Sequence, residues 1–129
     1  MPRQFVVQVP NKPGQMANLA EQMAAAGVDL RAIGGGSMGD SGHVIMTTAD
    51  DETAKAILDE GGYTYIEGES ILAEVDDRPG GMAALSRQLA DAGVNIYGHL
   101  FLGRWGDRAM FAFVVDKPDV ARPILERKG

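Results

Sequence analysis

The sequence predicts an α+β protein made of two consecutive βαββαβ units, each an antiparallel sheet with its helices on one face. The main observation is a repeat. Residues 13–30 and 79–96 align at a constant offset of 66, with 10 of 18 aligned positions identical. Each copy follows a strand-like run and precedes two more strand-like runs and a second helix-like run. A repeat that spans most of a chain indicates two copies of one structural unit.

The first unit begins with a strand over residues 4–9, because alternate residues are apolar and share one face. The pair Pro13-Gly14 ends this strand and begins a helix. The helix has an apolar stripe at helical spacing, which consists of Met16, Leu19, Ala20, Met23 and Ala24. Gly27 is expected to end the helix, since glycine adopts the positive φ needed there.

Three more strands and a second helix complete the first unit. Residues 28–33 and 43–48 are predicted strands, and the glycine-dense stretch 34–42 between them is predicted to be a hairpin connection or bulge region. Asp50, Asp51 and Glu52 favour a helix N-terminus, and its stripe is Ala54, Ile57 and Leu58. The pair Gly61-Gly62 ends this helix, and residues 63–66 form the fourth strand. This order is that of the ferredoxin-like fold.

The second unit repeats the order but stops short of the last strand. A short linker, residues 67–70, separates unit 1 (1–67) from unit 2 (70–129). The predicted elements of unit 2 are strands 71–75, 94–102 and 108–115, a helix over 80–92 and a helix near 120–127. Pro123 falls inside that last helix, which therefore starts late, near Asp119, or kinks. Because nothing corresponds to strand 63–66, one sheet edge of unit 2 is expected to be open to another chain.

The strand 109–115 reads A-M-F-A-F-V-V and is apolar on both faces. A sheet with helices on one side ordinarily exposes its other face to water, which produces alternation. Met110, Ala112 and Val114 therefore need cover as well as Phe111 and Phe113. We expect the open face of unit 2 to be packed against protein.

Composition and charge exclude several classes of function. The 129 residues carry a net charge of −6, which disfavours nucleic acid and anionic membranes as partners. There is no cysteine, and two histidines, His43 and His99, are too few for a histidine-based metal cluster. No signal peptide or membrane span is visible. We expect a cytoplasmic protein without a metal or cofactor.

The Pro-Gly segment before the first helix of each unit is a candidate anion site. Proline fixes the entry of the backbone, and glycine lets another group approach the start of the helix. The first N–H groups of the helix and the positive end of its dipole point to that place, which suits a carboxylate or a phosphate. The alternative is that Pro-Gly only makes a tight turn.

The same residues resemble a known family. The run V-D-D-R-P-G-G-M-A, with A-G-V-N-I at the end of the helix, resembles the ACT domain, a small βαββαβ regulatory module that often binds amino acids. The run V-P-N-K-P-G-Q-M-A with A-G-V-D-L is a second match. The resemblance covers nearly the whole chain and implies a stand-alone tandem ACT protein.

The resemblance also implies a ligand pocket at an interface between two ACT units, lined by the strand–helix loop of one unit and the helix–strand junction of another. By position, the ligand-binding residues are Asn11, Gly14, Gln15, Met16, Asp29 and Leu30 in unit 1, and Asp77, Gly80, Gly81, Met82, Asn95 and Ile96 in unit 2. Backbone N–H groups would hold the carboxylate of an amino acid. Unit 1 is expected to offer the better carboxylate site, because Asp76-Asp77 is acidic unless Arg78 compensates.

These observations lead to two hypotheses on function. The first is a non-catalytic regulatory protein that binds an amino acid at ACT–ACT interfaces, forms a homodimer through sheet or helix pairing, and exerts allosteric regulation on a partner enzyme or regulator. The second is a ligand-free interaction or dimerisation module. An RNA-binding sheet would need basic surroundings for Phe111 and Phe113, and no nucleophile–base pair indicates an enzyme. Trp105 is either a partner contact or folded back over the sheet.

Overall fold

The structure is a computed structural model that describes residues 2–126. The chain divides into two compact units between Gly68 and Glu69. The predicted tandem α+β fold is confirmed, with the element order βαββαβ in unit 1 and βαββα in the described part of unit 2.

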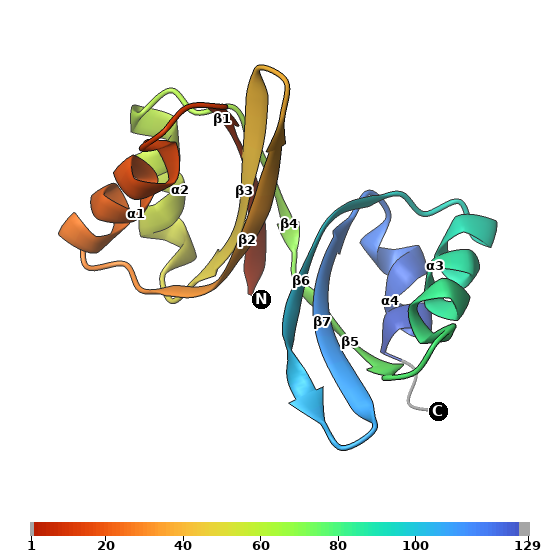
Figure 1. Cartoon of the computed structure of the whole chain (residues 1–129). Coiled ribbons are helices and arrows are strands. Elements are labelled where there is room, and N and C mark those ends of the chain that lie inside the picture. Colours follow the sequence, from red (N-terminus) through yellow and green to blue (C-terminus); the bar gives the residue numbers. More distant parts are fainter. Residues whose placement is uncertain (1, 127–129) are drawn as a thin grey trace. The chain divides into compact units, whose positions relative to one another are not determined.

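Unit 1 has a four-stranded sheet with both helices on one face (Figure 1). The elements are β1 (Arg3–Pro10), α1 (Gln15–Ala25), β2 (Leu30–Met38), β3 (Ser41–Thr48), α2 (Asp51–Glu60) and β4 (Tyr65–Glu69). The strand order is β2-β3-β1-β4, and β3 is antiparallel to both β1 and β2. The predicted linker is mostly strand, because β4 continues to Glu69 and β5 begins at Ile71.

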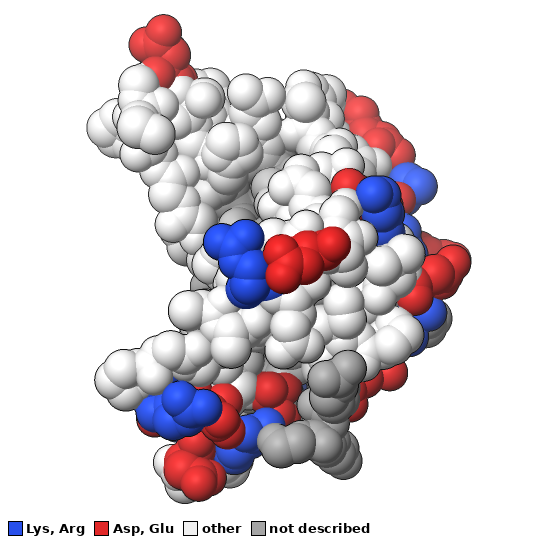
Figure 2. All heavy atoms as spheres, turned by 90° about the vertical axis from the view of Figure 1, so that its right-hand side faces the viewer, with Lys and Arg blue, Asp and Glu red and all other residues white. Residues whose placement is uncertain are grey.

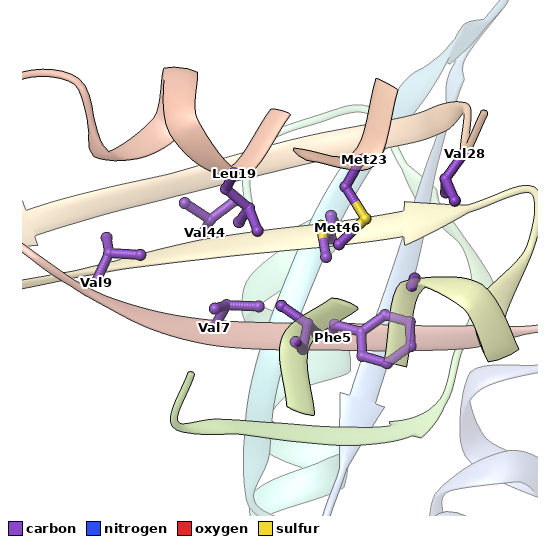
Figure 3. Close-up of a cluster of buried hydrophobic side chains, with 10 residues drawn as sticks. Phe5, Val7, Val9, Leu19, Met23, Val28, Val44 and Met46 are labelled. Atoms are coloured by element: carbon purple, nitrogen blue, oxygen red, sulfur yellow. The ribbon is translucent and has the colours of Figure 1, made fainter. Parts of the chain in front are cut away.

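The core of unit 1 lies between this sheet and its helices (Figure 3). β1 contributes every second residue, as its alternation predicts, and α1 contributes Leu19 and Met23. The predicted stripe of α1 is too long, since Met16 is 54% exposed and Ala24 is also exposed. The buried positions are Leu19 and Met23, one turn apart, whereas Met16 in the first turn and Ala24 beside Met23 stay in solvent.

The glycine stretch of unit 1 is strand rather than connection. β2 continues through Gly34, Gly35 and Gly36 to Met38, and these glycines pair with residues of β3. Only Gly39 and Asp40 form the turn. Backbone pairing with β3 outweighs the low strand propensity of glycine here.

Tyr65 carries a hydrogen bond that shifts its ionisation. Its hydroxyl donates to Asp59 Oδ1 at 2.5 Å, and this bond, with some desolvation, raises the pKa of Tyr65 to about 12. The neutral phenol is favoured in the folded state, so its stabilising effect is present below the ordinary pKa of about 10 and is lost as the pH rises towards 12. In an ultraviolet titration, Asp59→Asn should return this pKa towards 10. An unchanged titration would contradict the role of Asp59.

Unit 2 has a three-stranded sheet. Its elements are β5 (Ile71–Asp76), α3 (Gly81–Asp91), β6 (Ile96–Trp105), β7 (Arg108–Val115) and α4 (Pro118–Leu125). The order β5-β7-β6 leaves no strand on the outer edge of β5 among the described residues, as expected for a unit without its last strand. α4 starts at Pro118, one residue before Asp119, and extends two residues beyond Pro123. Residue 127, the predicted end of this helix, lies outside the described residues.

The two faces of β7 are both largely buried. Phe113 and Val115 pack with α3 and α4 in the core of unit 2, and Phe111 lies against that core. Ala112 and Val114, which the sequence assigns to the open face, are each only 1% exposed. That the open face of unit 2 packs against protein stays a prediction. Because Phe111 and Phe113 face the helices, they are not a free platform for stacking RNA bases.

Candidate functional site

The helices that begin the two repeats have unusual N-termini. Gly14 precedes α1 with φ 90° and Gly80 precedes α3 with φ 91°, a left-handed conformation that favours glycine. Neither helix has a side-chain cap or an acidic residue in its first turn. In contrast, α2 is capped by Asp50, which accepts a hydrogen bond from the Thr53 N–H at 3.1 Å. α1 and α3 therefore present the positive end of the helix dipole without compensation.

Backbone donors are free at both sites. In α1, the N–H groups of Gln15, Met16 and Ala17 have no acceptor among the described residues. In α3, Gly81 N donates to Arg78 O at 3.1 Å, while the N–H groups of Met82 and Ala83 have no such acceptor. Unpaired donors at a helix N-terminus bind anions such as a carboxylate.

Each strand–helix loop is fixed to the hairpin turn of its own unit. Asn11 N donates to Asp40 O at 3.0 Å, and the Asn11 side chain donates to Gly39 O at 2.9 Å. In unit 2, Asp77 N donates to Asp107 O at 2.8 Å. The side-chain amide of Asn11 is thus engaged in holding the loop, which leaves the backbone of α1 as the ligand-facing part.

A cavity of about 320 Å³ lies beside the N-terminus of α3, on the helical face of the sheet of unit 2. Met82, Phe111 and Ala109 provide apolar walls, and charged side chains line the rest. The full lining consists of Val75, Asp76, Asp77, Arg78, Pro79, Met82, Arg104, Ala109 and Phe111. This combination of apolar walls with a few charged groups is typical of a small-molecule site.

Arginines compensate the acidic loop of unit 2. Arg104 Nε lies 2.8 Å from Asp77 Oδ2, and Arg78 Nη2 lies 3.2 Å from Asp76 Oδ2. Arg108 also forms an ion pair with Asp76. At an offset of 67, the positions of Arg104 and Arg108 are occupied by serines in unit 1. The charge difference that favoured unit 1 is therefore offset by contacts within unit 2. Figure 2 shows basic side chains beside acidic ones rather than in a patch of one sign.

Within one unit, the structure does not bring the two halves of the expected site together. Asp76, at the end of β5, pairs with Arg108, whereas Ile96, at the start of β6, pairs with Val115 at the other end of β7. Asn95 lies at that second end, where its N–H donates to Asp116 Oδ1 at 2.8 Å. The loop and the junction thus occupy opposite ends of the same sheet.

The same separation holds in unit 1. Leu30 starts β2 opposite Thr48, whereas the loop after Pro10 lies beside Ser41 at the far end of β3. Asp29 forms an exposed ion pair with Arg31 at 3.4 Å. The ligand-binding role of the two junction pairs, Asp29-Leu30 and Asn95-Ile96, therefore stays a prediction.

Sequence reasoning missed Arg104 and Phe111, which line the cavity, and Arg108, which is not in the lining but pairs with Asp76 there. A signal for Arg108 was present, because the ferredoxin-like strand order places the third strand beside the first and so brings Arg108 next to Asp76. Arg104 is placed by the β6–β7 register, where it pairs with Ala109. A shift of the register lies just before it, between Phe101 and Gly103, and periodicity alone does not predict such a shift.

The described residues show no candidate metal centre. They contain no group of three His, Asp or Glu side chains arranged to hold a metal ion. His43 and His99 are both exposed, and His99 packs its ring 6.2 Å from that of Phe113. Among residues 2–126, no helix combines the length and the apolar composition of a membrane span.

Comparison with known proteins identifies the fold. No protein-family model matches the sequence, and no curated protein matches it. A crystal structure of a Bacteroides thetaiotaomicron protein is 18% identical, with TM-score 0.72, over 96% of this chain and 85% of that one. The ligand-free regulatory subunit of aspartate kinase from Thermus thermophilus is also 18% identical, with TM-score 0.62, over 96% and 89%.

A third structure, the regulatory subunit of aspartate kinase from Thermus flavus, is 15% identical, with TM-score 0.65, over 96% of this chain and 90% of that one. These similarities extend over nearly the full length of both chains. They confirm the expected fold, a tandem of ferredoxin-like βαββαβ units.

Proposed function

We propose that this chain is a non-catalytic regulatory protein that binds an amino acid and transmits its occupancy to a partner protein. The observation that carries the proposal is the uncapped N-terminus of α3 opening on a cavity of about 320 Å³ that contains both arginines and aspartates. Support for a regulatory role comes from the fold, which is shared with two proteins named as regulatory subunits of aspartate kinase.

The cavity of unit 2 has groups for each part of an amino acid. The free N–H groups of Met82 and Ala83, with Arg78, would hold the carboxylate. Asp77 would hold the ammonium group by exchanging its ion pair with Arg104. Met82 and Phe111 leave an apolar wall for the side chain. We therefore place the stronger site in unit 2, and unit 1 offers a second site at the start of α1.

Ligand-dependent melting tests the proposal. Each of the twenty amino acids is added to the full chain, and the melting temperature is recorded. A ligand present at 100 times its Kd stabilises the folded state by about 2.7 kcal/mol, which is readily measured. We expect at least one amino acid to raise the melting temperature. If none does, the sensor function is contradicted.

Two matched substitutions locate the site. Arg78→Ala and Lys12→Ala remove exposed cations at equivalent positions of the repeat, 66 residues apart. For the amino acid that stabilises the chain, we expect Arg78→Ala to weaken binding about three- to tenfold, because a charged hydrogen-bond donor is lost. Lys12→Ala should leave the Kd within about twofold. The opposite result would move the stronger site to unit 1.

The second candidate function is a ligand-free interaction module, and one observation favours it. The edge strand β6 exposes apolar side chains, among them Phe101 at 48% and Trp105 at 61%. The Trp105 ring folds back towards Gly103 and yet stays largely exposed. Exposed edges with apolar side chains pair with other chains, and we propose a homodimer. A mass measurement in solution tests this, and a monomer at all concentrations would exclude it.

A further inference from the structure

The outer edge of β5 has no covering strand among the described residues, but the equivalent edge in unit 1 does. The covered edge of unit 1 therefore serves as a template for what would bind β5. In unit 1, the equivalent edge of β1 is covered by β4, and Gln8 N donates to Thr64 O at 2.8 Å in that pairing. The equivalent of Gln8 in unit 2, at the repeat offset of 66, is Glu74 in the middle of β5. Glu74 pairs with Met110 as Gln8 pairs with His43, so the repeat predicts that the Glu74 N–H group points to the outer edge of β5, where another strand can accept it.

The template also shows which side chains the covering segment inserts. Tyr63 and Tyr65 pack against the core of unit 1, and the Tyr65 ring lies 6.1 Å from Phe5. The Tyr63 hydroxyl donates to Gln22 Oε1 at 3.3 Å. The edge of unit 1 is therefore closed by a strand that brings aromatic rings against the helices.

Unit 2 has a pocket at the matching place. It encloses about 150 Å³ and is lined by Glu74, Val75, Asp76, Gly81, Ala84, Leu85, Gln88, Arg108 and Ile124. Gln88 and Ile124 are the repeat counterparts of Gln22 and Ile57 of unit 1. Gln88 is exposed, and its side chain forms no hydrogen bond with another described residue. A cavity of about 150 Å³ holds one aromatic ring.

The charges at one end of this edge differ between the units. In unit 1, Glu67 of β4 lies 2.9 Å from Lys55 and 3.6 Å from Arg3. In unit 2, the counterparts of Arg3 and Lys55 are Glu69 and Arg122, which form a direct pair at 2.6 Å. Unit 2 therefore needs no acid from a covering strand, and an acid placed there would be repelled by Glu69. The 65–69 segment of a second copy carries such an acid, which argues against it as the occupant.

We propose that the outer edge of β5 and the adjacent pocket bind an extended strand of a partner protein, which inserts an aromatic side chain beside Gln88 and carries no acidic residue next to Glu69. The main-chain groups of β5 would provide affinity, and the pocket would provide selectivity for the side chain. The pocket adjoins the cavity of the proposed amino-acid site and shares Val75 and Asp76 with it, but strand pairing at β5 does not require a bound amino acid.

A synthetic peptide tests the proposal on the full chain. The probe is a labelled peptide with the sequence of residues 62–69 and the change Glu67→Gln, that is Gly-Tyr-Thr-Tyr-Ile-Gln-Gly-Glu, and binding is followed by fluorescence anisotropy. We expect saturable binding, loss of binding when both tyrosines of the peptide become alanine, and weaker binding when Glu67 is kept. Absence of binding at about 1 mM, or equal binding of the alanine peptide, would overturn the proposal.

Two variants of the chain distinguish the effect of main-chain pairing at the β5 edge from the effect of the Glu74 charge. Glu74→Pro removes the outward N–H group, and proline is tolerated on edge strands. Glu74→Ala removes the carboxylate but keeps the N–H group. Glu74→Pro should weaken peptide binding at least about tenfold, whereas Glu74→Ala should change it less than about twofold. Equal effects of the two variants would overturn strand pairing.

Hydrogen exchange provides a readout that does not depend on these variants. Addition of the peptide to the unmodified chain should slow amide exchange in β5 and leave exchange in β6, the other edge strand, unchanged. Slower exchange in β6 with no change in β5 would mean that the peptide binds elsewhere and would overturn the proposal.

Discussion

Replacing Phe5 by alanine is expected to lower the free energy of unfolding by about 3 to 5 kcal/mol. The Phe5 side chain is completely buried at 0% exposure and lies in the centre of the core of unit 1 (Figure 3). Alanine would leave a cavity in that core. A unit of 68 residues has only a few kcal/mol of stability of its own, so this loss is large enough to unfold unit 1.

Denaturant unfolding of the Phe5→Ala variant measures the effect, with amide exchange in β1 as a local readout. The matched control is Leu72→Ala in β5, because Leu72 is a large apolar residue that is 54% exposed. We expect less than about 1 kcal/mol for this control. If the two substitutions cost the same, Phe5 is not the centre of the core that the burial pattern indicates.

The fold was predictable because its signals are local. Alternation places Phe5, Val7 and Val9 on one face of β1, and helical spacing places Leu19 and Met23 on one face of α1. The repeat then transfers each assignment from one unit to the other. The exposed Met16 shows the limit of this reasoning: a periodic pattern identifies a face, but it does not say how far along the helix the sheet extends.

The site was only partly predictable because it depends on contacts that are distant in sequence. The Pro-Gly motif located the uncapped helix N-termini at Gly14 and Gly80. The ion pair of Asp77 with Arg104 joins residues 27 positions apart. Through this pair, Arg104 compensates the negative charge of Asp77, which the local sequence alone leaves uncompensated. Strand register decides such contacts, and register is not contained in a local pattern.

The three consecutive glycines of β2 look alike in the sequence, but the structure gives two of them different amounts of space for a side chain. A Cβ added to Gly35 would lie 2.1 Å from the backbone oxygen of His43, and Gly35 has φ +153°. A Cβ added to Gly36 would meet no atom within 4 Å. The close approach arises from the pairing of β2 with β3, so one glycine is required by packing and its neighbour is not.

Gly35→Ala is therefore expected to destabilise the chain by at least about 2 kcal/mol, because the strand must move away from the backbone of His43 or change its conformation. Gly36→Ala is the matched control. It should change stability by less than about 1 kcal/mol, since alanine also restricts the unfolded chain. Both free energies are measured by denaturant unfolding. Equal effects would mean that flexibility of the whole stretch, and not contact at one residue, explains the glycines of β2.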